Sequence, residues 1–170
     1  MRGMRDERVA ITTDAGDRAE AVAPVIVSAS RATDIPARYA DWFFARLRCG
    51  HLAWKNPFSG RLQYVSFART RAIVFWTKNP GPVLPLLPLL DERGIAYYFQ
   101  FTLNDYGPEG FEPGLLSLDE RIAVFQELSR RIGKERVIWR FDPVLATDRL
   151  GVDELLLRIQ NIGDRLAPFT

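Results

Sequence analysis

The sequence is poor in cysteine and histidine, and both shortages limit the metal sites it can build. Among 170 residues there is one cysteine, Cys49, and one histidine, His51. A single thiol excludes an internal disulfide and any cysteine cluster made by this chain alone. A single imidazole excludes a histidine-rich metal site. We therefore assign no metal ligands and no cofactor to this chain.

Long apolar runs and an excess of one charge are also missing. No run of about 18 apolar residues is present, and the first ten residues carry charges where a signal peptide needs an apolar segment. We expect a cytoplasmic protein with no membrane contact. The 23 basic and 21 acidic residues leave a net charge of +2, so nucleic-acid binding is not supported.

Short apolar segments alternate with helical patterns along the chain, and 47% of the residues are hydrophobic, as in globular domains. This alternation predicts an α/β fold with parallel strands and right-handed crossovers. Four β/α units are visible, whereas a closed (β/α)₈ barrel needs eight units and about 250 residues. We predict half of such a barrel, and a small open α/β sheet is the competing interpretation. The predicted strands cover residues 25–27, 72–76, 95–103 and 137–141, and the predicted helices cover 34–49, 83–93, 118–132 and 152–166.

Two hairpins are predicted outside the β/α units. The first covers residues 9–23, because Asp14 and Gly16 suit a turn between two short strands. The second joins residues 51–55 to 61–67 after the first helix. We therefore divide the chain into a hairpin extension, residues 1–24, and an incomplete barrel domain, residues 25–170.

Local signals place several helix ends and side chains. Thr33 or Asp34 is expected to cap the first helix, and Ser117 with Glu120 forms a capping box for the third. Pro85 and Pro88 predict a broken second helix. Three of the four tryptophans fall in core-facing patterns, and only Trp54 is left as a surface aromatic. The three are Trp42, Trp76 and Trp139.

Polar side chains gather where the predicted strands end. The carboxyl ends of parallel strands collect at one edge of a sheet, where ligands of α/β folds bind. We therefore expect one ligand site there. The candidate residues are Ser28, Ser30, Arg31, Lys78, Gln100, Thr102, Arg140 and Asp142.

Several of these residues have a structural interpretation that stays open. Arg140 and Asp142 share one face of a strand and form either a structural ion pair or part of a ligand site. Lys78 is a solvated loop lysine, a charge for an anion or, if desolvated, a nucleophilic amine. Gln100 and Thr102 are expected to point away from the helices, because polar groups under helices would lack partners.

Five ordered motifs resemble the bacterial domain of unknown function 1848 family. They are SASRATDIP from Ser28, NPF from Asn56, VFWTKNP from Val74, YYFQFTLNDYG from Tyr97 and GKERVIWRFDP from Gly133. The resemblance implies a longer protein with further β/α units and a C-terminus similar to the iron–sulfur motif of radical S-adenosylmethionine enzymes. A cluster is therefore expected only in full-length relatives.

Two functional hypotheses follow. In the first, the chain is the N-terminal half of a barrel-type enzyme, inactive by itself, whose full-length form carries iron–sulfur and radical S-adenosylmethionine-like chemistry. In the second, it is a non-catalytic domain that binds an anionic ligand or partner through Arg31, Lys78 and Arg140. Half a barrel also leaves open sheet edges, so we expect self-association.

Overall fold

The computed structural model describes residues 7–29, 33–56 and 59–170. Its strands are β1 (Arg8–Thr12), β2 (Arg18–Val22), β3 (Ile26–Ala29), β4 (His51–Lys55), β5 (Leu62–Ser66), β6 (Ala72–Thr77), β7 (Ala96–Thr102) and β8 (Val137–Arg140). Its helices are α1 (Ile35–Arg38), α2 (Ala40–Cys49), η1 (Gly81–Leu86), α3 (Pro88–Glu92), α4 (Leu118–Ile132), η2 (Lys134–Arg136), α5 (Val152–Leu166) and η3 (Ala167–Phe169).

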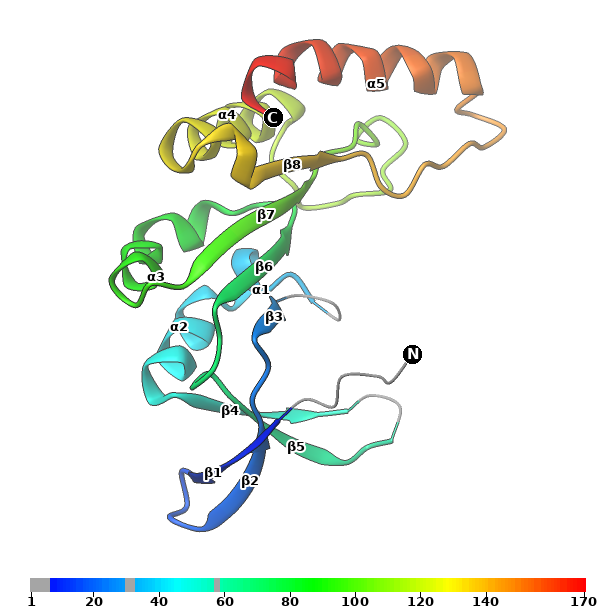
Figure 1. Ribbon diagram of the computed structural model, residues 1–170. Helices are drawn as coiled ribbons and strands as arrows, with labels where there is room; N and C mark the ends of the chain where they lie inside the picture. Colours follow the sequence, from blue (N-terminus) through cyan, green and yellow to red (C-terminus); the bar gives the residue numbers. More distant parts are fainter. Residues whose placement is uncertain (1–6, 30–32, 57–58) are drawn as a thin grey trace, which may run out of the picture.

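The four predicted core strands form one parallel sheet in the order β3-β6-β7-β8 (Figure 1). Each strand neighbours the next core strand in the sequence, as expected when β/α units follow one another. The predicted α/β class with a parallel sheet is confirmed. Within the described residues the sheet is open, with β3 and β8 at its edges, and no barrel is present.

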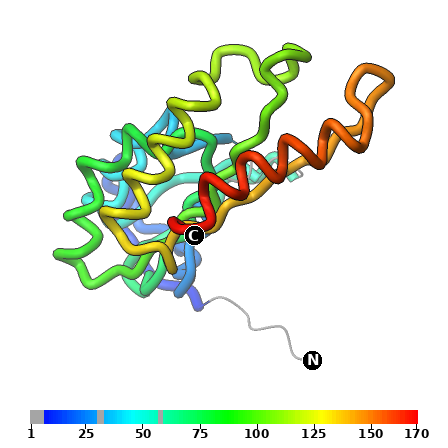
Figure 2. The backbone as a smooth tube through the Cα atoms, turned by 90° about the horizontal axis from the view of Figure 1, so that it is seen from above, coloured from blue at the N-terminus to red at the C-terminus, as the bar shows by residue number. Residues whose placement is uncertain are grey.

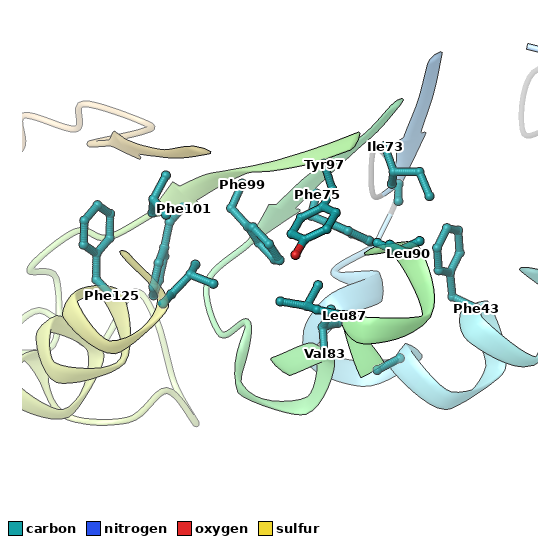
Figure 3. Close-up of a cluster of buried hydrophobic side chains, with 14 of the residues drawn as sticks. Phe43, Ile73, Phe75, Val83, Leu87, Leu90, Tyr97, Phe99, Phe101 and Phe125 are labelled. Atoms are coloured by element: carbon teal, nitrogen blue, oxygen red, sulfur yellow. The ribbon is translucent and has the colours of Figure 1, made fainter. Parts of the chain in front are cut away.

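Side chains alternate in direction along each strand, and this places aromatic side chains on one face of the sheet. Phe75, Phe99 and Phe101 are fully buried on that face, while Trp76 and Gln100 between them are partly exposed. Figure 3 shows the aromatic side chains packed against helical residues such as Val83 and Leu90. Burying each such side chain contributes about 1.5–3 kcal/mol, so this layer is the main core.

All the packed helices lie on that same face. Helices α1 to α4 stand on one side of the strands in Figure 1, and α5 lies along β8 in Figures 1 and 2. The α5 side chains Ile162 and Leu166 belong to the same core. We call the opposite face the helix-free face, since none of the described helices covers it (Figure 1).

The predicted local signals are confirmed where the structure describes them. Asp34 Oδ1 accepts a hydrogen bond from Ala37 N at 3.0 Å and caps α1. The Ser117–Glu120 capping box opens α4. Gly50, at φ 85°, ends α2 in the left-handed conformation that glycine favours. The second predicted helix is broken into η1 and α3, with Pro85 inside η1.

The two predicted hairpins are present, and they join into a second sheet of order β1-β2-β5-β4. The junction is a parallel pairing of β2 with β5, which includes Ala21 opposite Tyr64. The turn of the first hairpin is tied to α2, because Arg46 donates to both oxygens of Asp14 at 2.8 and 3.1 Å. These bonds lower the pKa of Asp14 from its usual value.

Trp42 does not lie in the core as predicted. Trp42 is 44% exposed, about as much as Trp54 at 42%. The buried side of α2 is formed by Ala40, Phe43, Phe44 and Leu47, and Trp42 lies outside that set.

Among the described helices, none combines the length and the apolar character needed to cross a membrane.

Candidate functional site

The register of the parallel sheet brings candidate residues into rows at its carboxyl edge. Trp76 lies opposite Gln100, and Thr102 lies opposite Arg140. Thr77 pairs with Phe101 at the end of β6 and β7. The residues that follow this pair are Lys78 after β6 and Thr102 on β7. The side chains of Ser28, Trp76, Gln100, Thr102 and Arg140 belong to the helix-free face by strand alternation.

Trp76 connects the first and last strands of the sheet. Its indole Nε1 donates a hydrogen bond to Ser28 Oγ on β3 at 3.1 Å. The Arg140 guanidinium on β8 lies over the same ring, 4.6 Å from its centre, and at a partly exposed site such a contact is favourable by about 0.5–1 kcal/mol. Arg140 Nη2 also donates to Asp142 Oδ2.

Lys78 is held at the end of β6 by two carboxylates. Its backbone N–H donates to Asp34 Oδ2 at 2.8 Å, and its ammonium pairs with Glu112 Oε1. The Lys78 side chain is 35% exposed, whereas Glu112 is 9% exposed. Lys78 is therefore an ion-paired lysine at the rim of the site.

Asn104 links the Lys78 and Arg140 ends of the site. It is fully buried just after β7. Its Nδ2 donates to Glu112 Oε1 at 3.3 Å and to the Asp142 carbonyl at 3.0 Å, and its Oδ1 accepts from Asp142 N at 2.9 Å. One amide side chain thus fixes the backbone next to the Arg140–Asp142 pair.

A buried arginine completes the polar cluster beneath this edge. Arg121 Nη1 lies 3.7 Å from Glu112 Oε2, and the Arg121 side chain is 5% exposed. Nε and Nη1 of Arg121 and Oε2 of Glu112 make no hydrogen bond in the structure. The single carboxylate of Glu112 therefore balances two cations, Lys78 and Arg121, in a largely buried setting.

We use the name strand-end site for Ser28, Trp76, Lys78, Gln100, Thr102, Arg140 and Asp142. The four strands are three spacings of about 4.8 Å apart, so the site spans about 14 Å. That span suits one small ligand.

The candidates Ser30 and Arg31 lie outside the described residues. As predicted, Gln100 and Thr102 point away from the helices.

Sequence reasoning missed several members of this arrangement. Trp76 was assigned to the core, although it alternates with Phe75 and shares a face with Gln100. Arg121 occupies the buried side of α4 with Phe125 and Leu128, and an arginine on such a stripe indicates a buried ion pair. Glu112 lies in a loop rich in glycine and proline, where no periodic signal identifies it.

The described residues hold no group of three or more histidine, cysteine, aspartate or glutamate side chains arranged to bind a metal ion. Cys49 is exposed at the end of α2, on the helix-covered side. Iron–sulfur clusters take several thiolate ligands. The residues of this chain therefore do not fit such a cluster.

Comparison with known proteins gives one family. A family model described as a domain of unknown function, DUF1848, matches residues 26–170, which is most of the chain and includes all of the parallel sheet. No curated protein sequence and no solved structure gives a significant match.

Proposed function

The chain belongs to the DUF1848 family, and we propose that it is the N-terminal half of a barrel-type enzyme whose substrate binds at the strand-end site. In this proposal residues 1–24 are an extension and residues 25–170 are an incomplete barrel domain. The substrate carries an anionic group, which Arg140 recognises.

One-sided coverage supports the barrel part of the proposal. Doubly wound open sheets carry helices on both faces, whereas a (β/α)₈ barrel carries them only outside. Here the packed helices share one face, and the helix-free face corresponds to a barrel interior. The consecutive strand order β3-β6-β7-β8 is also that of successive barrel strands.

The observation that carries the functional part is the position of Arg140. Its guanidinium lies over Trp76 and pairs with Asp142, at the carboxyl end of a strand. Asp142 occupies only part of the guanidinium, which has five N–H donors in a planar fork. The remaining donors suit a carboxylate or phosphate. Asp142, with 52% of its side chain exposed, can accept a hydrogen bond from a bound substrate.

The iron–sulfur chemistry expected of full-length relatives stays outside this chain. Cys49 alone cannot supply the thiolates, so the cluster's ligands would come from other parts of a longer protein. The residues described here would bind and orient the substrate.

Thermal unfolding with a panel of small carboxylates and phosphates tests the proposal. A ligand at 100 times its dissociation constant stabilises the fold by about 2.7 kcal/mol, which raises the melting temperature of a chain this size by about 5–10 °C. Arg140→Gln should abolish that rise. Arg130→Gln is the matched control, because Arg130 lies over Phe169 at 5.1 Å, outside the site.

Absence of any ligand-dependent rise in the wild-type chain, or an equal rise in Arg140→Gln, would contradict the proposal. The alternative function, a non-catalytic domain for an anionic ligand, is favoured by the row of Lys78, Thr102 and Arg140. Product analysis by mass spectrometry separates the two: the enzyme in full-length form converts the bound ligand, and the binding domain returns it unchanged.

A further inference from the structure

We propose that the substrate carries a second acidic group, which binds in the place that the Glu112 carboxylate occupies in this structure. The inference rests on the proposed function, in which Arg140 recognises the first acidic group, and it narrows the substrate to a small diacid. We use the name carboxylate cradle for Lys78, Asn104 and Arg121, whose side-chain nitrogens face the Glu112 carboxylate.

The protein's own carboxylate shows what the cradle binds. The Lys78 ammonium pairs with Glu112 Oε1, and Asn104 Nδ2 donates to the same oxygen at 3.3 Å. Arg121 Nη1 faces the other oxygen, Oε2, at 3.7 Å. Two cations and one amide, from three separate parts of the chain, therefore converge on one carboxylate. Charged and amide N–H donors of this kind are the groups that recognise a carboxylate ligand.

Glu112 fills the cradle incompletely. Nε and Nη1 of Arg121 and Oε2 of Glu112 are buried without a hydrogen-bond partner, and the Arg121 side chain is only 5% exposed. A buried charged group that lacks its hydrogen bonds destabilises the fold. A carboxylate that is not tied to a loop backbone can move closer to Arg121 and accept these bonds. The cradle is therefore better matched to a free carboxylate than to Glu112.

The position of Glu112 in the chain permits its replacement. Glu112 lies in the loop between β7 and α4, and its neighbours Phe111 and Pro113 are exposed. Gly110 and Gly114 on either side have positive φ angles of 72° and 79°, which glycine adopts without strain. A small outward movement of this loop would withdraw the carboxylate without disturbing a core strand or helix.

The cradle lies close enough to Arg140 for one small molecule to reach both. Lys78 and Arg140 flank Thr102 on its two sides, so their backbones are two strand spacings, or about 10 Å, apart. The Arg140 guanidinium lies over Trp76 on β6, the strand that Lys78 follows, and this shortens the gap between the two cations. Lys78, with 35% of its side chain exposed, connects the cradle to solvent. Two acidic groups joined by a short carbon chain fit this separation.

Isothermal titration calorimetry with matched acids tests the inference. Succinate, glutarate and adipate are each compared with the monocarboxylate of the same carbon number, which is butyrate, valerate or caproate. At least one diacid should bind the wild-type chain about tenfold or more tightly than its matched monocarboxylate, because a second charge-assisted contact contributes about that factor.

Lys78→Met should bring the dissociation constant of that diacid to the value of its monocarboxylate, because the cradle loses its exposed cation. Lys134→Met is the matched control. Lys134 is exposed in η2, just before β8 and at the opposite end of that strand from Arg140. Its loss removes the same charge from the chain and should leave the preference for the diacid intact.

Glu112→Gln distinguishes a displaced carboxylate from a merely structural one. Removing the resident negative charge should lower the dissociation constant of the diacid by about tenfold, whereas a structural role predicts unchanged or weaker binding. Circular dichroism checks that this variant is folded at about 15 °C, near the usual temperature of maximum stability. The comparison of acids on the wild-type chain does not depend on this variant.

Equal binding of diacids and monocarboxylates that still requires Arg140 would overturn this inference and leave the proposed function standing. A diacid preference that survives Lys78→Met, or diacid binding that does not tighten in folded Glu112→Gln, would also overturn it. Binding of none of the six acids would overturn it as well, and the phosphates of the wider panel would then decide the proposed function.

Discussion

The Arg140 guanidinium lies over the Trp76 ring, 4.6 Å from its centre, although the two residues come from strands separated by β7. Trp76 is oriented by its hydrogen bond to Ser28, and Arg140 by its ion pair with Asp142. Three strands thereby fix the position of one cation on the helix-free face.

Arg140→Gln should change ligand binding much more than stability. The contact with Trp76 and the partly exposed pair with Asp142 are each worth about 1 kcal/mol or less. Urea denaturation should therefore show a loss of about 1 kcal/mol, together with complete loss of the ligand-dependent stabilisation. A loss above about 3 kcal/mol, in the range of a broken buried ion pair, would instead identify Arg140 and Asp142 as a structural pair.

Asn104→Ala should destabilise the fold by about 2–4 kcal/mol. The substitution removes three hydrogen bonds and leaves the backbone N–H and carbonyl of Asp142 without their partner, and each unsatisfied buried group costs about 1–3 kcal/mol. Calorimetry should show a melting temperature lower by about 4–16 °C. Asn161→Ala, at an exposed position on α5, is the control and should melt like the wild type.

Glu112→Gln should destabilise the chain by about 3–5 kcal/mol, because it leaves buried Arg121 without its carboxylate. The double variant Glu112→Gln with Arg121→Met should recover at least half of that loss, since replacing the buried cation removes the uncompensated charge. Equal stability of the single and double variants in urea denaturation would show that Arg121 is not the source of the cost.

Acid should weaken the attachment of α5 to the loop after β7. Arg158 donates to both oxygens of Glu109 at 2.9 Å and to the Asp105 carbonyl at 2.6 Å. The hydrogen bonds from Arg158 lower the pKa of Glu109. A lowered glutamate pKa stabilises the fold above the unfolded value of about 4.3, and this stabilisation is lost as the pH falls through the folded value.

Glu109→Gln should therefore lower the free energy of unfolding by about 1.5–3 kcal/mol at pH 7. Below about pH 4.3, the stability of this variant should fall less steeply with pH than that of the wild type. Glu154 offers a control on the same arginine, because it bonds to Arg158 but is 53% exposed. Glu154→Gln should cost only about 0.3–0.5 kcal/mol. Denaturation across a pH series measures both variants, and parallel curves for Glu109→Gln and the wild type would contradict the prediction.

Local interactions determined much of the secondary structure, and these could be predicted from the sequence. The Ser117–Glu120 capping box involves residues three apart, and the prolines that break the second helix act on their own turn. Alternation within β7 likewise separates Gln100 from Phe99 and Phe101 without any information from other strands. The strand ends, and with them most of the candidate residues, follow from the same short-range rules.

Tertiary structure decided what depends on distant segments. The pairing of β2 with β5, which joins two hairpins into one sheet, is not encoded in either hairpin's own turn. Trp42 follows helical spacing yet is exposed, because α2 meets the sheet along another side. Glu112 reaches Lys78 and Arg121 only because its loop folds back over the sheet edge. Short-range patterns determine which side chains can share a face, and only chain packing determines which of them meet.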